Sequence, residues 1–403
     1  MKTLMILCTA PDERLEMAIK EAASLEYRTI FCGEKMHEPT KNAADAFYVV
    51  DYADSAELIR IAQKEKIDGV VGLCDSAMIP AAKIAEALHL PGNPPETMEK
   101  LISKIEFRKL QREAGIFCPK NIVISSPEEF LKQENSMSFP VIIKPELASS
   151  SHGMTVLENS AHFEEAFREA AAVSRNGKCC VEEYVQNNSL RIIETDIFLY
   201  EDDFFWDGMR YCYRLDIAPL RPAYDVYSVS LSEKELAEFR NSVASVLKHA
   251  GAKIGEYNLE GFFTKEGRFF IIEINPRQAG HYNPQDIQLH CGVNLTKLLI
   301  TTAVGETGYY KEVKNQKRTY RPILSYSVFS EKNGILDSIH IDESIKPKIR
   351  EFRYLMGQKE GDSIQNIIDA VRPIAQIAFE FDSAEELEST RKRISELVYA
   401  VVK

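Results

Sequence analysis

The sequence lacks the long apolar runs and the basic runs that mark membrane proteins and nucleic-acid-binding proteins. No stretch reaches the roughly 18 consecutive apolar residues that a transmembrane helix needs. Lys and Arg number 49 against 61 Asp and Glu, which gives a formal net charge of −12, and the basic residues form no cluster. This charge balance disfavours polyanionic partners. We therefore expect neither nucleic acid nor a membrane as a partner.

Cysteine is present, but never in a Cys-x-x-Cys spacing. The eight cysteines are scattered, apart from the adjacent Cys179 and Cys180 in a predicted strand. This pattern favours reduced thiols and a cytoplasmic location. The apolar run that ends at Cys8 is too short for a secretion signal, so we expect it to form a buried first strand.

Glycine is scarce where nucleotide-binding fingerprints would need it. Residues 8–11, after the first predicted strand, read Cys-Thr-Ala-Pro, and no Gly-x-Gly-x-x-Gly or Gly-x-x-x-x-Gly-Lys motif occurs. This absence argues against a dinucleotide-dependent oxidoreductase and against a P-loop nucleotidase. Strand and helix patterns nevertheless alternate over residues 1–95, which predicts a small α/β unit with a mainly parallel sheet. The 403 residues are enough for two to four subdomains.

The most informative stretch is a predicted β-hairpin with strands at 258–264 and 269–275 and a loop at 265–268. This loop pairs Thr264 with Phe269 and brings Glu260 opposite Glu273. Because side chains alternate along a strand, we expect Phe269, Ile271, Glu273 and Asn275 to share one face.

Two facing carboxylates in apolar company need a compensating cation. Glu260, Glu273 and Asn275 offer hard oxygen donors, which suit Mg²⁺, with Mn²⁺ as a second candidate. Arg277 follows the rigid Pro276 and adds a planar cationic group suited to phosphate or carboxylate. The hairpin therefore predicts a metal and phosphate site.

The order Glu260, Glu273-Ile-Asn-Pro-Arg277 resembles the metal-binding signature of the ATP-grasp superfamily of ligases. The resemblance covers nearly the whole chain and implies an α/β ATP-grasp fold with five parts. These are a Rossmann-like N-terminal (pre-ATP-grasp) lobe at 1–95, a linker helix at 96–118, a lid subdomain at 119–185, a central subdomain with the metal site at 186–307, and a C-terminal α/β subdomain at 308–403.

The resemblance also implies an ATP site built from several segments. Lys104 and Lys144 would reach the nucleotide phosphates, and a small-residue loop would wrap them. Glu182 would accept the exocyclic amine of adenine, and the backbone of Glu183 and Val185 would recognise the ring edge. Glu194 would bind the ribose, with Asp196 on the same face as the alternative. Arg277 would steady the transferred phosphoryl group. The loop consists of Ser149, Ser150, Ser151, His152 and Gly153.

The activity implied is an ATP-dependent ligation of a small carboxylate and an amine, through an acyl phosphate, with release of ADP and phosphate. Two alternatives stay open: a carboxyphosphate-forming enzyme like carbamoyl-phosphate synthetase, and a non-catalytic ATP-binding module that acts with a partner subunit. A biotin-carboxylase-like reaction is disfavoured, because residues 278–281 read Gln-Ala-Gly-His and lack the glutamate expected there. A homodimer is a possible assembly.

Three local expectations concern regions without sharp motifs. Residues 96–115 read as one amphipathic helix. Arg210, Arg214 and Arg221 lie in a Tyr-rich segment that we expect to be irregular, where one of them clamps a substrate carboxylate or all three lie at the surface. Residues 383–402 read as a closing helix.

Overall fold

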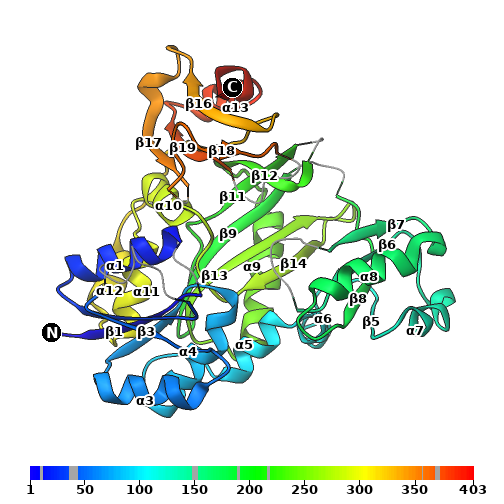
Figure 1. Cartoon of the computed structure of the whole chain (residues 1–403), viewed down its shortest axis with the longest axis horizontal. Helices are drawn as coiled ribbons and strands as arrows, with labels where there is room; N and C mark the ends of the chain where they lie inside the picture. Colours follow the sequence, from blue (N-terminus) through cyan, green and yellow to red (C-terminus); the bar gives the residue numbers. More distant parts are fainter. Residues whose placement is uncertain are drawn as a thin grey trace.

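The computed structural model describes residues 1–9, 12–35, 44–147, 153–187, 191–215, 218–355, 357–367 and 373–403. Figure 1 shows three regions around a large central sheet: an N-terminal lobe, a lid that projects to one side, and a C-terminal region above. In the described parts of the chain, no helix is both long enough and apolar enough to cross a membrane.

The N-terminal lobe is a four-stranded parallel sheet in the order β3-β2-β1-β4. Both faces of this sheet are buried. In the strand Thr3–Leu7, Leu4 and Ile6 pack in one apolar cluster, and Met5 and Leu7 pack in another. The prediction of a parallel α/β unit is therefore confirmed. The strands are β1 (Thr3–Leu7), β2 (Arg28–Gly33), β3 (Ala46–Val49) and β4 (Gly69–Gly72), and the helices are α1 (Glu13–Ser24), α3 (Ser55–Glu65) and α4 (Asp75–Ala87).

Two helices follow where the sequence predicts one. Helix α5 covers Pro95–Ile102 and α6 covers Lys104–Glu113. The break falls at Ser103, whose backbone is extended and whose hydroxyl accepts a hydrogen bond from Glu106 N at 3.3 Å, as an N-cap does. The prediction of a continuous helix is wrong, and the break makes Lys104 the first residue of α6.

The lid is an antiparallel sheet in the order β5-β8-β6-β7. Helices α7 (Pro127–Leu131) and α8 (Phe163–Val173) cover it, and Phe130 stacks on Phe163 in their shared core. This sheet places Lys144 and Glu182 on neighbouring strands. Its strands are β5 (Asn121–Ile124), β6 (Val141–Pro145), β7 (Thr155–Leu157) and β8 (Cys179–Glu183).

The central sheet runs in the order β14-β13-β9-β11-β12-β15-β19-β17, with β10 paired to β9. Helix α9 (Glu233–Ala250) packs on one face, and α10 (Asn283–Cys291) and α11 (Leu295–Ala303) pack on the other. The strands are β9 (Arg191–Tyr200), β10 (Asp203–Phe205), β11 (Arg210–Leu215), β12 (Ala218–Tyr227), β13 (Ile254–Phe263), β14 (Phe269–Asn275), β15 (Ile323–Val328), β17 (Ile349–Tyr354) and β19 (Ala375–Glu380).

The C-terminal residues contribute to two sheets. Strands β15, β17 and β19 extend the central sheet, whereas β16 (Gly334–Ile341), β18 (Ser363–Ile364) and β20 (Val398–Val402) form a smaller one. The predicted closing helix is correct only in part, because α13 (Ala384–Arg391) and α14 (Ile394–Leu397) give way to β20. Val398 is fully buried, and this valine-rich end pairs with β16.

Candidate active site

The hairpin of β13 and β14 pairs Glu260 with Glu273 as predicted, although its loop and its register near the loop differ from the prediction. Phe263, not Thr264, pairs with Phe269, so the loop has one residue more than expected. Gly267 takes a positive φ of 75° in this turn, which glycine adopts without strain. A β-bulge then leaves Ile272 without a pairing residue on β13. This extra residue shifts the register by one, so that Glu260 again lies opposite Glu273.

The bulge also decides which side chains share a face. Phe269, Ile271 and Ile274 all pack in the core with Phe239 of α9. Glu273 and Asn275 flank Ile274 and therefore point to the opposite face. The prediction that Phe269 and Ile271 share the face of Glu273 and Asn275 is wrong, because the extra residue reverses the alternation.

Three carboxylates stand side by side on that face. Glu260 of β13 pairs with Glu273 on one side and with Glu194 of β9 on the other. Arg214 donates to Glu260 Oε2 at 3.2 Å. Burial and the neighbouring Glu194 and Glu273 raise the pKa of Glu260 to about 8, although Arg214 and Arg277 act in the opposite direction. We call Glu194, Glu260 and Glu273 the acidic row.

Asn275 completes the predicted metal set. Its Nδ2 donates to Glu273 Oε1 at 2.8 Å, which uses the amide nitrogen and leaves the amide oxygen as a ligand. The donors are thus all oxygens, as Mg²⁺ prefers. Burial and the two flanking carboxylates, which raise the pKa of Glu260, disfavour its charged form unless a further cation is present. On both counts the residues fit a divalent cation.

The arginines predicted to lie in an irregular segment lie in strands. Arg210 is fully buried in β11, where it donates to Glu194 at 2.8 Å and to Asp196 at 2.7 Å. Both arginines of β11, Arg210 and Arg214, therefore bind acids of their own sheet and neither is a surface residue. Arg221 lies in β12.

A second group of ligand atoms adjoins the acidic row. Atoms of Glu194, Cys212 and Asp225 lie within 4.8 Å of one another. The guanidinium of Arg210 already pairs with Glu194 at 2.8 Å and lies 3.7 Å from Asp225. Because a buried cation neutralises this group, we regard it as an ion-pair network and not as a metal site.

Lys144, at the end of a buried lid strand, is held by Glu182. Its Nζ lies 2.6 Å from Glu182 Oε2, and Arg108 Nε lies 2.8 Å from Glu182 Oε1. Burial alone would raise the pKa of Glu182, but these two cations outweigh it and lower the pKa to about 2. The contact of Glu182 with adenine stays a prediction, and in the structure this carboxylate orients Lys144.

Lys104 lies close to Glu273 of the acidic row and to Lys144 of the lid. Burial lowers its pKa, nearby Glu273 acts in the opposite direction, and nearby Lys144 lowers it further. Lysines from two separate elements, α6 and the lid, thus lie close together, and the one from α6 lies close to the acidic row as well. This is the placement expected of groups that neutralise a polyphosphate bound to a metal.

The remaining predicted nucleotide contacts are only partly described. Ser149, Ser150, Ser151 and His152 lie outside the described residues. Gly153 has a φ of 69°, and a Cβ there would lie 2.6 Å from Val173. Glu183 N donates to Lys120 O at 2.9 Å, and Val185 lies two residues after the end of β8. Their roles, and the ribose contact of Glu194, stay predictions.

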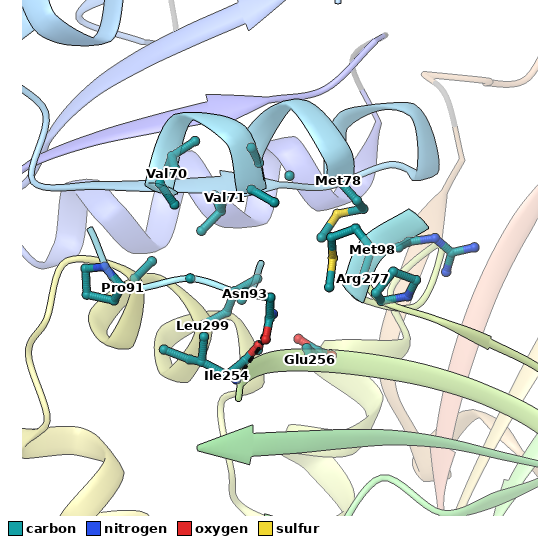
Figure 2. A pocket seen from close by; sticks show the side chains of 18 of the residues that line it. Val70, Val71, Met78, Pro91, Asn93, Met98, Ile254, Glu256, Arg277 and Leu299 are labelled. Atoms are coloured by element: carbon teal, nitrogen blue, oxygen red, sulfur yellow. Dashed lines mark hydrogen bonds between the residues drawn. The ribbon is translucent and has the colours of Figure 1, made fainter. Parts of the chain in front are cut away.

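Arg277 connects the site to the N-terminal lobe. Its Nε donates at 2.8 Å to Asp75, the first residue of α4. Beside this pair lies a mostly apolar cavity of about 70 Å³ between β4, α4, β13 and α11. Figure 2 shows Met78 and Met98 near Arg277 at one end of this cavity, and Leu299 and Pro91 toward the other end. The lobe therefore helps to fix the direction of Arg277.

Two functional candidates escaped the sequence-based prediction. Arg108 stands four residues after Lys104, and this i, i+4 spacing on one helix face was the available signal. Asp75 had no comparable signal, because it is 202 residues from its partner Arg277.

The fold and the site together define an ATP-grasp protein. An ATP-grasp N-terminal domain matches residues 19–92, and the family described as "Carbamoyl-phosphate synthase L chain, ATP binding domain" matches residues 103–307. The second match covers half of the chain. The chain therefore belongs to this ATP-grasp family, as its motif order predicts.

Known proteins resemble the chain in sequence and in structure. The carbamoyl phosphate synthase large chain of Thermotoga neapolitana is 27% identical over 229 residues, which are 55% of this chain and 20% of that one. The chain thus spans about a fifth of the length of this relative.

Two solved structures share the fold along the whole chain. The L-amino acid ligase from Bacillus licheniformis has a TM-score of 0.83 at 18% identity, over 100% of this chain and 99% of that one. The biotin carboxylase domain of the Hydrogenobacter thermophilus 2-oxoglutarate carboxylase, solved with MgADP, ADP and bicarbonate, has a TM-score of 0.75 at 16% identity, over 100% and 91%.

Proposed function

We propose that the protein is an ATP-dependent carboxylate–amine ligase. A carboxylate substrate takes the γ-phosphoryl group of ATP to become an acyl phosphate, and an amine then displaces phosphate to form an amide. ADP and phosphate are the other products. The observation that carries this proposal is the acidic row, with Lys104 close to both Glu273 and Lys144, and with Arg277 held by Asp75.

The protein's part in such a reaction is positioning and charge neutralisation, because phosphoryl transfer needs little covalent help. Glu260, Glu273 and Asn275 would hold Mg²⁺, with Mn²⁺ as the alternative ion. When bound, the ion neutralises the β- and γ-phosphates. Lys104 and Lys144 neutralise the remaining phosphate charge. The MgADP complex of the carboxylase domain with the same fold supports this assignment.

Arg277 is the residue best placed to steady the transferred group. Asp75 accepts from its Nε at 2.8 Å and Gln278 O accepts from its Nη1 at 3.2 Å, so the guanidinium is held in place and its remaining donors can bind an anion. The ligand of Arg277 is then the phosphoryl group or the acyl phosphate.

A carboxyphosphate-forming reaction is the second candidate, and the match of the family model to carbamoyl-phosphate synthase favours it. Both reactions use the same nucleotide site and differ in the carboxylate that is phosphorylated. Pairs of amino acids and other small carboxylates would show the first reaction, and bicarbonate alone would show the second. Phosphate release in such a screen therefore tells them apart.

The variant Glu273→Gln tests the proposal. It keeps the shape of the side chain and removes one metal-binding charge. Mg²⁺-dependent ADP release, measured with the best substrate of the screen, should fall on the order of 100-fold. Glu266→Gln, in the exposed loop of the same hairpin, is the matched control and should keep wild-type activity. Wild-type turnover in Glu273→Gln, or no turnover of the wild type with any substrate, would contradict the proposal.

A further inference from the structure

Arg108 lies where three elements of the site meet. It projects from α6, is 1% exposed, and contacts both β8 of the lid and β14 of the central sheet. Figure 1 shows α6 between these two sheets. Phe107 and Phe270 pack on the guanidinium, with ring centroids 5.5 Å and 5.3 Å away. A buried arginine is costly unless its donors are used, so its partners indicate what it does.

The first set of partners fixes Lys144. Arg108 Nε and Nη2 donate to the two oxygens of Glu182, at 2.8 Å and 3.3 Å. This two-point contact sets the plane of the carboxylate. Glu182 Oε2 then accepts from Lys144 Nζ at 2.6 Å. The direction of Lys144 thus depends on Arg108 through Glu182.

The second set of partners is the β-bulge. Arg108 Nη1 donates to Ile271 O at 3.1 Å and Nη2 donates to Ile272 O at 2.9 Å. Gln111, one turn of α6 away, adds a bond to Ile271 O at 3.2 Å. Because β14 is an edge strand, these donors satisfy carbonyls that have no neighbouring strand. The bulge is the feature that turns Glu273 toward the metal face.

The charges in this cluster favour an anion beside it. Arg108 and Lys144 carry two positive charges against the single negative charge of Glu182, and all three side chains are at least nine-tenths buried. One positive charge is left over where the nucleotide phosphates are proposed to bind. Only arginine has enough donors in one plane to reach Glu182 and both carbonyls; the single ammonium of lysine does not.

We propose that Arg108 is a positioning residue that sets Lys144 and the Glu273 carboxylate together. This inference rests on the proposed function, since it assigns Lys144 to the nucleotide and Glu273 to the metal. Nucleotide binding and metal binding are then coupled through one side chain that contacts neither ligand. A residue that merely filled the core would change stability without linking the two.

Calorimetric titration of ADP, in EDTA and in excess Mg²⁺, tests the inference. Arg108→Lys keeps the charge and loses the planar set of donors. It should weaken ADP binding in EDTA about tenfold and should also reduce the gain in affinity that Mg²⁺ provides. Arg112→Lys, one turn further along α6 and exposed, is the matched control and should bind like the wild type. Arg108→Lys binding within twofold of the wild type in both buffers would overturn the inference.

Double variants separate positioning from a general loss of structure. If Arg108 acts through Lys144, then Arg108→Lys adds little to the loss of ADP binding in EDTA caused by Lys144→Ala. If it acts through the bulge, it adds little to the loss of the Mg²⁺ effect caused by Glu273→Gln. Fully additive effects in both pairs would overturn the inference. A wild type that binds no ADP in either buffer would instead remove the proposed function itself.

A further variant keeps the inference testable if Arg108→Lys does not fold. Gln111→Met removes the second donor to Ile271 O and the acceptor that Arg108 Nη1 contacts at 2.6 Å, but it changes neither Glu182 nor Lys144. It should reduce the gain in ADP affinity from Mg²⁺, and amide hydrogen exchange in the peptide that contains Ile271 and Ile272 should be faster. An unchanged Mg²⁺ effect in Gln111→Met would overturn the part of the inference that concerns the bulge.

Discussion

At the scale of single residues, the acidic row is the feature from which we predict a dependence on a cation. Glu260 lies between two other carboxylates, and its only hydrogen bond from a cation among the described residues comes from Arg214 at 3.2 Å. Burial and the two neighbouring carboxylates raise the pKa of Glu260 to about 8, so without further positive charge its protonated form is favoured at neutral pH. A bound metal ion would remove that proton. Metal affinity should therefore rise with pH up to about 8.

The same residue should make stability fall as pH rises. Between about pH 4.5 and pH 8, folded Glu260 keeps a proton that the unfolded chain has lost, so the free energy of unfolding decreases across this range. In Glu260→Gln this contribution is absent. Melting temperatures at pH 5 and pH 8, without metal, should differ less in Glu260→Gln than in the wild type, by on the order of 2 °C.

Glu266→Gln is again the control, because it lies in the exposed loop of the same hairpin. It should keep the wild-type dependence of melting temperature on pH. Equal pH dependence in Glu260→Gln and the wild type would show that the acidic row does not hold a proton.

At the scale of elements, the bulged hairpin shows what a sequence can and cannot predict. The pairing of Glu260 with Glu273 was predicted correctly because two errors cancelled: the loop is one residue longer than expected, and Ile272 has no partner. The run Phe-Phe-Ile-Ile before Glu273 is apolar throughout and so carries no signal for which face each side chain takes. Arg108, which holds the bulge, is 163 residues from Ile271 in the chain.

Packing around the bulge leaves no room for a side chain at position 261 of β13. A Cβ at Gly261 would lie 2.6 Å from both the Phe269 ring and Phe270 O. Gly261→Ala should therefore cost about 1–3 kcal/mol of stability and lower the melting temperature by a few degrees. It should also weaken metal binding, because it displaces the strand that carries Glu260. Differential scanning calorimetry with and without Mg²⁺ and ADP would measure both effects.

Gly308→Ala is a suitable comparison for that variant, since a Cβ there meets nothing within 4 Å. Its melting temperature should match that of the wild type. If Gly261→Ala were as stable as Gly308→Ala, the close packing of β13 on β14 would not matter for stability.

At the scale of the whole molecule, the site is assembled from parts that are distant in sequence. The order of motifs predicted the ATP-grasp fold and its family, and both are confirmed. The links between the parts were not predicted, because an ion pair such as Asp75 with Arg277 depends on how the N-terminal lobe packs on the central sheet. No local pattern of residues encodes such a contact.

The lid should become more resistant to proteolysis when nucleotide binds. Lys144 lies in the lid and Glu273 in the central sheet, so a ligand held by both ties the two together. A non-hydrolysable ATP analogue with Mg²⁺ should slow cleavage within residues 121–183 several-fold, as followed by mass spectrometry. Lys144→Ala should lose most of this protection. An unchanged cleavage rate in the wild type would show that the lid does not respond to nucleotide.

The central sheet does not end where the family match ends. Strand β12 pairs with β15 from Tyr224 opposite Tyr326 to Tyr227 opposite Ile323, beyond the match to 103–307. A fragment cut at residue 307 would expose the ten-residue β12 as a bare edge ready to pair with another copy. We expect that fragment to aggregate on expression and the full chain to stay monodisperse, because residues 308–403 cover the edge of β12.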